Sequence, residues 1–401
     1  MVDDELAKAV GSRVLHHRTL ARKSRPVIAG LAGISISYLD YIEHGRKLPA
    51  LPDLLAIAEA LEVEPGELLQ ARPAKPLQRA AVLETGDLHR AVTMPTMSEP
   101  MEVAELSRHV RTLWKTWQTS PNRYTELTAA LPGIIEATTA TVRGDASGRQ
   151  RQANAVAADL YGLLRTVAKR VGLPDLSLLA VDRAITAAEQ ADDPVRLAGA
   201  HWNLAQVHLA DRRPAEAEDA AMTALDALRA AVGPERDDVT AMSGALLLIA
   251  AIAAIAAVRK RKPWVGREQL RQAAPLADRV GDSNICWTAF GPANLAMYSV
   301  AIEVETGEAA EGLRLASKVD SGRVPSIERR VAFLLDSAKG FTQRRDFSQA
   351  MTLLETAHAE APEDITFRPA AHALVRMVLQ RGRRDVSRKA AHLAGTAGLA
   401  L

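Results

Sequence analysis

The chain has 401 residues, which is enough for two or three domains. Its net charge of +2 excludes a basic field over the whole molecule, and its single cysteine, Cys286, excludes an internal disulfide and a cysteine-based zinc site. Aromatic residues make up only 4% of the chain, alanine and leucine dominate, and alternating runs of β-branched residues are few. This composition favours an all-α protein.

The pattern of apolar and capping residues over 1–70 predicts a first domain of five short helices. Ser24 is placed to cap the second helix, and Pro26 suits its first turn. The third helix is expected over residues 35–44, and the fourth and fifth begin at Pro52 and Pro65. The first helix is marked by apolar residues at helical spacing, namely Leu6, Val10, Val14 and Leu15.

The second and third helices have the pattern of a helix-turn-helix. Gly33 supplies the residue that tolerates positive φ in the turn, and Ser35 can cap the next helix. Leu39 and Ile42 give that helix one buried face, and Gly45 ends it. A helix of this size fits the major groove of DNA.

Positive charge is concentrated on this unit. From Arg13 to Lys47 the sequence has seven Lys and Arg residues and only two acidic residues, Asp40 and Glu43. A local excess of this kind neutralises phosphates in DNA-binding domains.

These features resemble the Xre-type helix-turn-helix, the lambda-repressor-like DNA-binding domain. The resemblance covers residues 4–70, and its specific parts are the segments 31–33, 35–47 and 54–69. It implies double-stranded DNA as a partner. It places Ile36, Ser37 and Tyr41 against bases, and Arg25, Ser35, Tyr38, Arg46 and Lys47 against phosphates. The alternative is a helix-turn-helix used for protein docking, because Ile36 and Tyr41 stand where the family often has polar or basic residues.

Residues 71–98 are rich in proline and polar residues and predict a linker, with a short helix near residues 77–83. Residues 99–401 repeat a spacing of small and apolar residues typical of paired helices. They resemble tetratricopeptide-like repeats in an α-solenoid. One unit fits especially well through Phe333, Ala338, Phe341, Ala350, Leu354, Ala357 and Pro362.

The two parts together resemble peptide-responsive quorum-sensing regulators of Gram-positive bacteria, and more closely a group of actinobacterial regulators. The runs 120–124 and 161–172 carry the second likeness. The resemblance implies a cytoplasmic transcriptional regulator that forms a homodimer and binds a peptide or small-molecule effector. It identifies neither the operator nor the effector.

An effector site is expected on the concave face of the repeats. Asn203 and Asn294 both occur as Asn-Leu-Ala, and an asparagine amide can clamp a peptide backbone. Arg165, Lys169 and Gln206 lie at nearby helical spacings. Trp202 is interpreted as a core residue.

The remaining motifs argue against other classes. Residues 239–258 lack charge and are long enough to cross a membrane, but eight alanines favour a soluble core helix, so no membrane partner is expected. Recognised nucleophile, phosphate-loop and metal motifs are missing, which indicates no enzyme, no cofactor and no metal. Cys286 and Trp287 are expected in an apolar helix, with the thiol buried.

Overall fold

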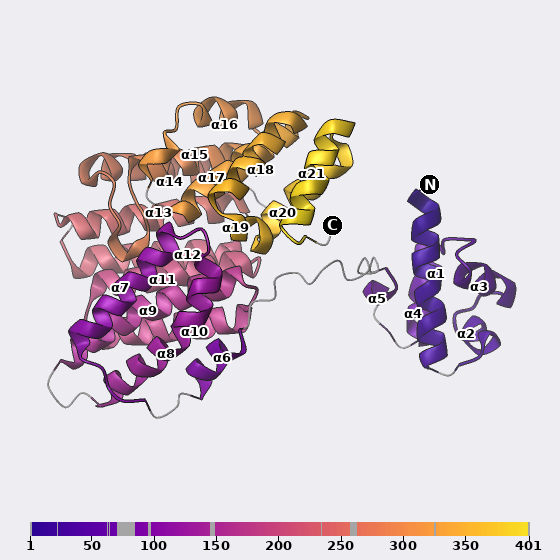
Figure 1. Ribbon diagram of the computed structural model, residues 1–401, viewed down its shortest axis with the longest axis horizontal. Coiled ribbons are helices and arrows are strands. Elements are labelled where there is room, and N and C mark those ends of the chain that lie inside the picture. Colours follow the sequence, from indigo (N-terminus) through magenta and orange to yellow (C-terminus); the bar gives the residue numbers. More distant parts are fainter. Residues whose placement is uncertain are drawn as a thin grey trace. The chain divides into compact units, whose positions relative to one another are not determined.

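The structure is a computed structural model that describes residues 2–21, 23–61, 63, 65–69, 85–94, 98–144, 149–233, 235–256, 263–324 and 326–399. Over these residues it contains helices and no strand, so the all-α prediction is confirmed. The chain divides into two compact units, residues 1–78 and 79–399 (Figure 1). The predicted helix at residues 77–83 lies outside the described residues.

The first unit has the five predicted helices around one apolar core. They are α1 (Val2–Leu20), α2 (Arg25–Leu31), α3 (Ile36–Glu43), α4 (Leu51–Leu61) and α5 (Pro65–Leu69). Val10 and Val14 are fully buried in this core, whereas Leu6 and Leu15 lie more than a third exposed, so the apolar stripe of α1 is narrower than predicted. Ser24 stands at the N-cap position of α2 but makes no side-chain capping bond, and Pro26 occupies the first turn.

Two glycines let α1 cross α3 closely. A Cβ atom on Gly11 would lie 2.0 Å from the carbonyl oxygen of Ile42, and one on Gly45 would lie 2.6 Å from the Cα of Lys8. Gly45 ends α3 with φ +66°, as the sequence predicts, and Gly33 has the same φ in the turn before α3. The close crossing fixes α3 on the core and leaves its outer face open.

The second unit is an array of paired helices. Its first members are α6 (Gly86–Thr93), α7 (Val103–Thr119), α8 (Arg123–Gly144), α9 (Gln150–Arg170), α10 (Pro174–Gln190), α11 (Pro194–Ala210), α12 (Pro214–Ala231) and α13 (Asp237–Ala256). It continues with α14 (Pro263–Val280), α15 (Pro292–Thr306), α16 (Ala309–Ala316), α17 (Ile327–Gln343), α18 (Phe347–Glu360), α19 (Pro362–Phe367), α20 (Pro369–Arg381) and α21 (Arg384–Thr396). Two 3-10 turns, η1 (Ile285–Trp287) and η2 (Ser321–Arg323), lie between helices.

Its core is a succession of clusters built from helices that are neighbours in sequence, as expected for a solenoid. The turns between α10 and α11, α11 and α12, and α17 and α18 each contain a residue with positive φ. These residues are Asp192, Arg212 and Arg345. The recurrence agrees with a repeating architecture, while the tetratricopeptide assignment stays a prediction.

Helix α6 differs from the predicted linker over residues 71–98. Leu88, Ala91 and Val92 are buried against the second unit, and α6 packs on α8. Their spacing of three and four residues is an amphipathic signal in so short a stretch that the surrounding prolines obscured it.

Helix α13 contains the apolar run that was weighed as a membrane span. Among the residues that the structure describes, it is one of two segments with the length and hydropathy to cross a membrane, the other being Ile285–Thr306. Within the array 89% of its most apolar window is buried, and it packs against α12 and α14. This burial agrees with a core helix.

The contact between α13 and Phe290 gives a test of this packing. A Cβ on Gly244 would lie 1.9 Å from the ring of Phe290, which is fully buried. We expect Gly244→Ala to lower the free energy of unfolding by about 1–3 kcal/mol in urea titrations, because the core is overpacked. Gly133→Ala in α8 is the matched control, since nothing lies within 4 Å of that Cβ. It should stabilise by about 0.5–1 kcal/mol. If the two variants have the same free energy of unfolding, the packing of Phe290 on Gly244 is wrong.

Candidate nucleic-acid interface and effector cavity

Helix α3 presents three of the predicted base-contacting side chains on one open face. Ser35 caps the helix, its Oγ accepting a hydrogen bond from the Tyr38 N–H at 3.1 Å. Leu39 and Ile42 are fully buried, which turns the opposite face outward. On that face Ile36 is 51% and Tyr41 47% exposed, and Ser37 is exposed beside them.

A buried carboxylate holds α3 in place. The Glu43 side chain has no exposed surface and accepts from Arg18 Nε at 2.5 Å and from Arg25 Nε at 2.6 Å. Burial raises the pKa of Glu43, but the two arginines outweigh burial and hold that pKa below its usual value. Arg25 also pairs with Asp40 at 2.8 Å. Arg25, predicted to face a phosphate, therefore also positions α3.

The side chains that flank α3 divide into anchored and open ones. The Tyr38 hydroxyl donates to Asp53 Oδ2 at 2.9 Å, and the Lys47 Nζ lies 4.9 Å from the centre of the Tyr38 ring. Burial and then Asp53 raise the pKa of Tyr38, which keeps its hydroxyl a donor. Arg46 and Lys47 are exposed after the end of α3. The open cations thus border the open face.

A buried charge network closes the second unit by joining α8, in its first part, to α19, in its last part. Asp364 of α19 accepts from the Tyr124 hydroxyl at 2.7 Å and from Arg368 Nε at 2.7 Å, and it pairs with Arg123. Arg123 and Asp364 are completely buried. Burial raises the pKa of Asp364, and Arg368 and Arg123 outweigh it, so that pKa lies below its usual value. Burial and Asp364 raise the pKa of Tyr124 to about 12.

The network continues toward the interior of the array. Glu328, at the start of α17, pairs with Arg170 of α9 and lies 3.7 Å from Arg368. Burial raises the pKa of Glu328, and Arg170 and Arg368 overcome it, so Glu328 is held as a carboxylate. Helices that are far apart in sequence are therefore joined around a common interior.

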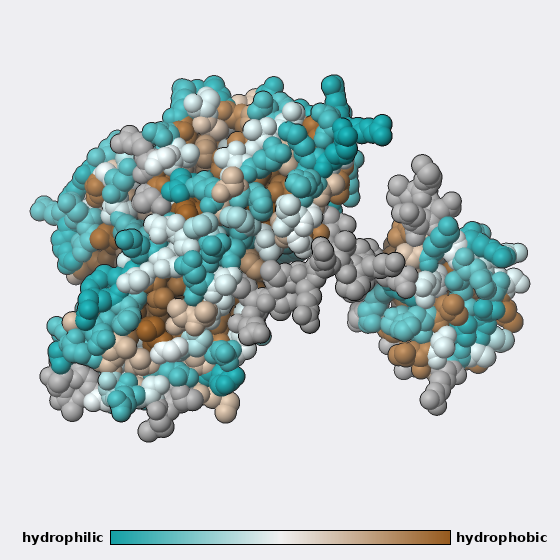
Figure 2. Space-filling view, viewed as in Figure 1, coloured by the Kyte–Doolittle hydropathy of each residue, from teal (hydrophilic) through white to brown (hydrophobic). Residues whose placement is uncertain are grey.

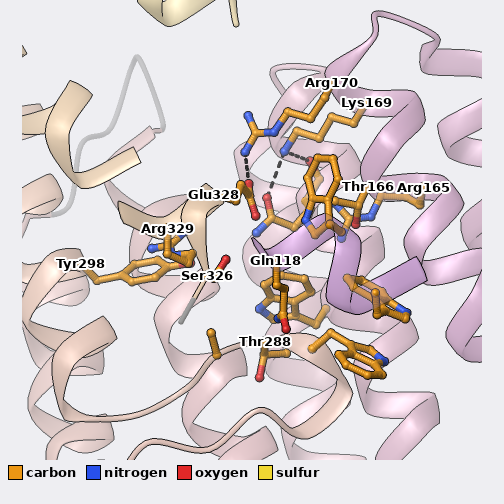
Figure 3. Close-up of a pocket in the computed structure, with 16 residues that line it drawn as sticks. Gln118, Arg165, Thr166, Lys169, Arg170, Thr288, Tyr298, Ser326, Glu328 and Arg329 are labelled. Atoms are coloured by element: carbon orange, nitrogen blue, oxygen red, sulfur yellow. Dashed lines mark hydrogen bonds and ion pairs between the residues drawn. The ribbon is translucent and has the colours of Figure 1, made fainter. Parts of the chain in front are cut away.

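A cavity of about 60 Å³ lies in that interior (Figure 3). Figure 3 shows Arg165, Lys169 and Arg170 of α9 on one side and Arg329 with Tyr298 on the other. Four tryptophans also line it: Trp114, Trp117, Trp202 and Trp287. The cavity combines aromatic walls with four cationic side chains.

The amides predicted to contact an effector hold these cations. Arg165 donates to Asn203, Lys169 donates to Gln206 Oε1 at 3.0 Å, and Arg329 donates to Asn294 Oδ1 at 3.0 Å. Arg165, Lys169 and Gln206 line the cavity, and their contact with an effector stays a prediction. Asn203 and Asn294 are buried beside it instead. Their amide oxygens accept from arginines and so orient those cations, while a contact of either asparagine with an effector stays a prediction.

Two of the arginines stack on aromatic rings. Arg165 lies 5.6 Å from the ring centre of Trp202, and Arg329 lies 4.3 Å from that of Tyr298. Trp202 packs partly against the core, as predicted, and also forms part of the cavity wall.

Residues 281–291 form a wall that sequence reasoning missed. Cys286 and Trp287 were expected in a helix, but they lie in η1 with φ of 46° and 62°. Gly281 ends α14 and Pro292 starts α15, so helix breakers on both sides prevent a continuous helix. Trp287 stacks on Trp114 with ring centres 5.1 Å apart.

The same segment is anchored at two further points. Asn284 and Gln118 exchange amide hydrogen bonds of 2.9 and 3.1 Å. The half-buried Cys286 packs against Gly199, and burial raises the pKa of its thiol. Among the described residues, no cluster of side chains suited to a metal ion occurs.

Residues 9–71 match the family described as a helix-turn-helix domain. The first unit is a helix-turn-helix domain. The match ends at residue 71, so the array of helices is not part of it. No curated protein matches the chain in sequence.

Solved structures of other proteins align with the chain at low identity. PlcR of Bacillus thuringiensis, solved with a peptide and DNA, is 12% identical over 90% of this chain and 99% of its own, with a TM-score of 0.31. ComR of S. thermophilus is 11% identical over 94% and 100%, with a TM-score of 0.36. Human IFIT1, solved as a dimer with PPP-AAAA, is 14% identical over 75% and 64%, also at 0.36. Scores this low identify neither fold nor function.

The Glu43 anchor predicts a stability change confined to the first unit. Glu43→Gln leaves two arginines without their shared buried carboxylate, and we expect a loss of about 3 kcal/mol at neutral pH. Because the folded-state pKa of Glu43 is lowered, its stabilising effect is present above its unfolded pKa and fades as the pH falls through the folded value. Amide hydrogen exchange in α3 measures it. Glu59→Gln, at an exposed position of α4, is the control and should change little.

The buried network around Asp364 closes the second unit and predicts a similar dependence of its stability on pH. Asp364→Asn removes the carboxylate between Arg123 and Arg368, and we expect about 3–5 kcal/mol less stability at neutral pH. The folded-state pKa of Asp364 is lowered, so the difference from the unchanged chain should shrink in acid. Tryptophan fluorescence in urea follows this unit, because Trp117 lies 5.1 Å from the Arg123 guanidinium. Asp278→Asn, on the exposed side of α14, should unfold like the parent chain. Unfolding of Asp364→Asn at the parent's urea concentration would contradict the closure.

Proposed function

We propose that the chain is an Xre-type, DNA-binding transcriptional regulator whose helical array senses a ligand. The observation that carries the proposal is the open face of α3, with Ile36, Ser37 and Tyr41 exposed on a helix whose other face is fixed by Glu43. In this proposal the exposed face enters the major groove of double-stranded DNA.

The side chains take different tasks in that docking. Ser37 and Tyr41 offer hydroxyls to base edges, and Ile36 offers an apolar contact to a thymine methyl group. Arg46 and Lys47 neutralise phosphates beside the groove. The hydroxyl of Ser35 is used for the helix cap, so its part in DNA binding is to present the N-terminus of α3.

A homodimer in the cytoplasm is the expected working form. One recognition helix reads few bases, and two-fold symmetric pairs double the site. The helical array is then the sensor, and a coupling of about 1–3 kcal/mol between effector and operator changes occupancy roughly 5- to 150-fold. By linkage, operator DNA changes effector affinity by the same factor.

A second candidate is protein docking through the helix-turn-helix. It is favoured by apolar side chains near α3, because Leu31 is 63% and Val27 47% exposed. Figure 2 shows hydrophobic patches on the surface of this unit.

Selection of genomic fragments with the purified full-length chain separates the two candidates. Enrichment of a short inverted repeat supports the regulator. Recovery of fragments without a common sequence, with a salt dependence no steeper than that of an unrelated protein, favours docking.

The flanking cations predict a salt-dependent loss of DNA binding. We expect Arg46→Ala/Lys47→Ala to weaken binding to all sequences and to reduce the slope of log K against log salt by roughly two, one for each lost phosphate contact. Ser37→Ala or Tyr41→Phe should change which sequence is preferred and leave the slope as it is. Fluorescence anisotropy at several salt concentrations measures both effects.

Arg376→Ala, at an exposed position of α20, is the control for loss of a surface charge. It should bind with the parent's slope. If the double variant also keeps that slope, the docking of α3 assigned above is wrong.

A further inference from the structure

We propose that the cavity of the helical array binds the anionic end of an amphipathic ligand, a carboxylate or a phosphoryl group, and that the apolar part of the ligand lies in the adjoining groove. This names the class of effector for the proposed regulator and rests on that function only for its biological purpose. The binding itself follows from the charges, burial and shape described next.

The cavity holds more positive charge than its acidic groups can compensate. Arg165, Lys169, Arg170 and Arg329 line it, together with a single carboxylate, Glu328. That carboxylate is shared by Arg170 and by Arg368, and Arg368 is not among the residues that line the cavity. The hydrogen bonds of Arg165, Lys169 and Arg329 described above run to neutral amides. Among the described residues none of these three forms an ion pair. Burial lowers the pKa of Arg165 and of Lys169, and Glu328 opposes that shift without bonding to either of them.

Burial makes this arrangement costly without an anion. Arg165 is only 4% exposed, and its Nε has no hydrogen-bond partner. Burial lowers the pKa of Arg165 to about 9. Burial, Arg170 and Arg165 together lower the pKa of Lys169 well below its usual value. Buried like charges beside neutral partners favour an anion, which relieves their repulsion and accepts the unused N–H.

Further donors face the same space. Thr166, Thr288 and Ser326 line the cavity, and Ser326 is the N-cap residue of α17, whose side chain makes no capping bond. The first amides of this 17-residue helix start beside the cavity, and the positive end of a helix favours an anion. The helix end acts together with the unpartnered Arg165 Nε.

The shape of the space defines the rest of the ligand. The cavity of about 60 Å³ has room for a carboxylate or phosphoryl group. Next to it lies a groove of about 450 Å³ that shares Lys169, Gln206, Tyr298 and Arg329 with the cavity. Apolar residues form much of the groove: Leu209, Ile249, Ile252, Ile255, Ala301 and Ala332. An anionic end bound by the arginines therefore places an attached apolar chain against the isoleucines of α13.

Two acidic residues line the groove, Glu305 and Asp336, and they favour an anionic end in the cavity over one in the groove. Glu305 pairs with Lys339 at 2.6 Å. Burial raises the pKa of Asp336 to about 6, although Arg329 opposes the shift, so Asp336 is mostly a carboxylate at neutral pH, and it lines the groove and not the cavity. Arg165, Lys169 and Arg329, which form no ion pair among the described residues, lie at the cavity end of the groove.

Intrinsic fluorescence of the full-length chain tests the proposal, because four of its five tryptophans line the cavity. The probes are decanoate and decyl phosphate, each below its micellar concentration. Decanol and decyltrimethylammonium carry the same tail without a negative charge. We expect both anions to change the fluorescence and raise the melting temperature, and the neutral and cationic probes to bind at least about 10-fold more weakly. The tighter of the two anions shows whether carboxylate or phosphate is the preferred end.

Variants locate the binding. Arg329→Gln removes a half-buried cation at the boundary of cavity and groove, and we expect affinity for both anions to fall about 10- to 100-fold. Ile252→Ser should weaken decanoate and leave acetate unchanged, because only the tail contacts α13. Arg376→Gln, an exposed arginine of α20, should bind like the parent chain. Melting curves confirm that each variant is folded.

Three outcomes would overturn the proposal: no response to either anion, equal binding of decanol and decanoate, or unchanged anion affinity in folded Arg329→Gln. Binding to DNA is measured separately. Loss of the proposed regulator function would appear as absence of sequence-selective DNA binding, with the fluorescence response to anions intact.

Discussion

Asp364 joins α19, in the last part of the helical array, to α8, in its first part, and the interior depends on this contact. Its carboxylate joins Arg123 and Tyr124, at the start of α8, to Arg368 at the start of α20. All of these groups are buried, so the network is stable only when every member is present. An open solenoid would expose the inner faces of its helices, whereas this contact draws α8 and α19 together.

The closure explains why a charged cavity exists at all. Arg170 and Arg368 reach Glu328 only because α9, α17 and α20 face a common interior. The segment 281–291 completes the wall, since Trp287 stacks on Trp114 and Asn284 pairs with Gln118. Positive φ at Cys286 and Trp287 is tolerated because these anchors and the seat of Cys286 on Gly199 fix the turn. In this way, an irregular segment between α14 and α15 forms part of the wall of the charged cavity.

The sequence was most informative where the signal is local. Gly33, Ser35 and Gly45 predicted the turn, cap and end of α3, because each acts through its own backbone or a neighbour three residues away. The run 120–124 was noticed only as a family likeness, since the partner of Arg123 lies 241 residues further along the chain. Asn203 and Asn294 were predicted on a concave face, whereas they are buried, and the arginines that donate to their amide oxygens come from other helices. Pairings of this kind depend on how the array curves, which periodicity does not specify.

The closed array has a consequence for how such proteins change during evolution. An open solenoid can gain or lose a helix pair at little cost, because each pair contacts only its neighbours. Here a helix pair inserted between α10 and α17 would move Asp364 away from Arg123, and a deletion would drive them together. Buried contacts between distant helices, with Arg123–Asp364 and Arg170–Glu328 among them, therefore fix the circumference. Related chains should vary in loop length far more readily than in their number of helix pairs.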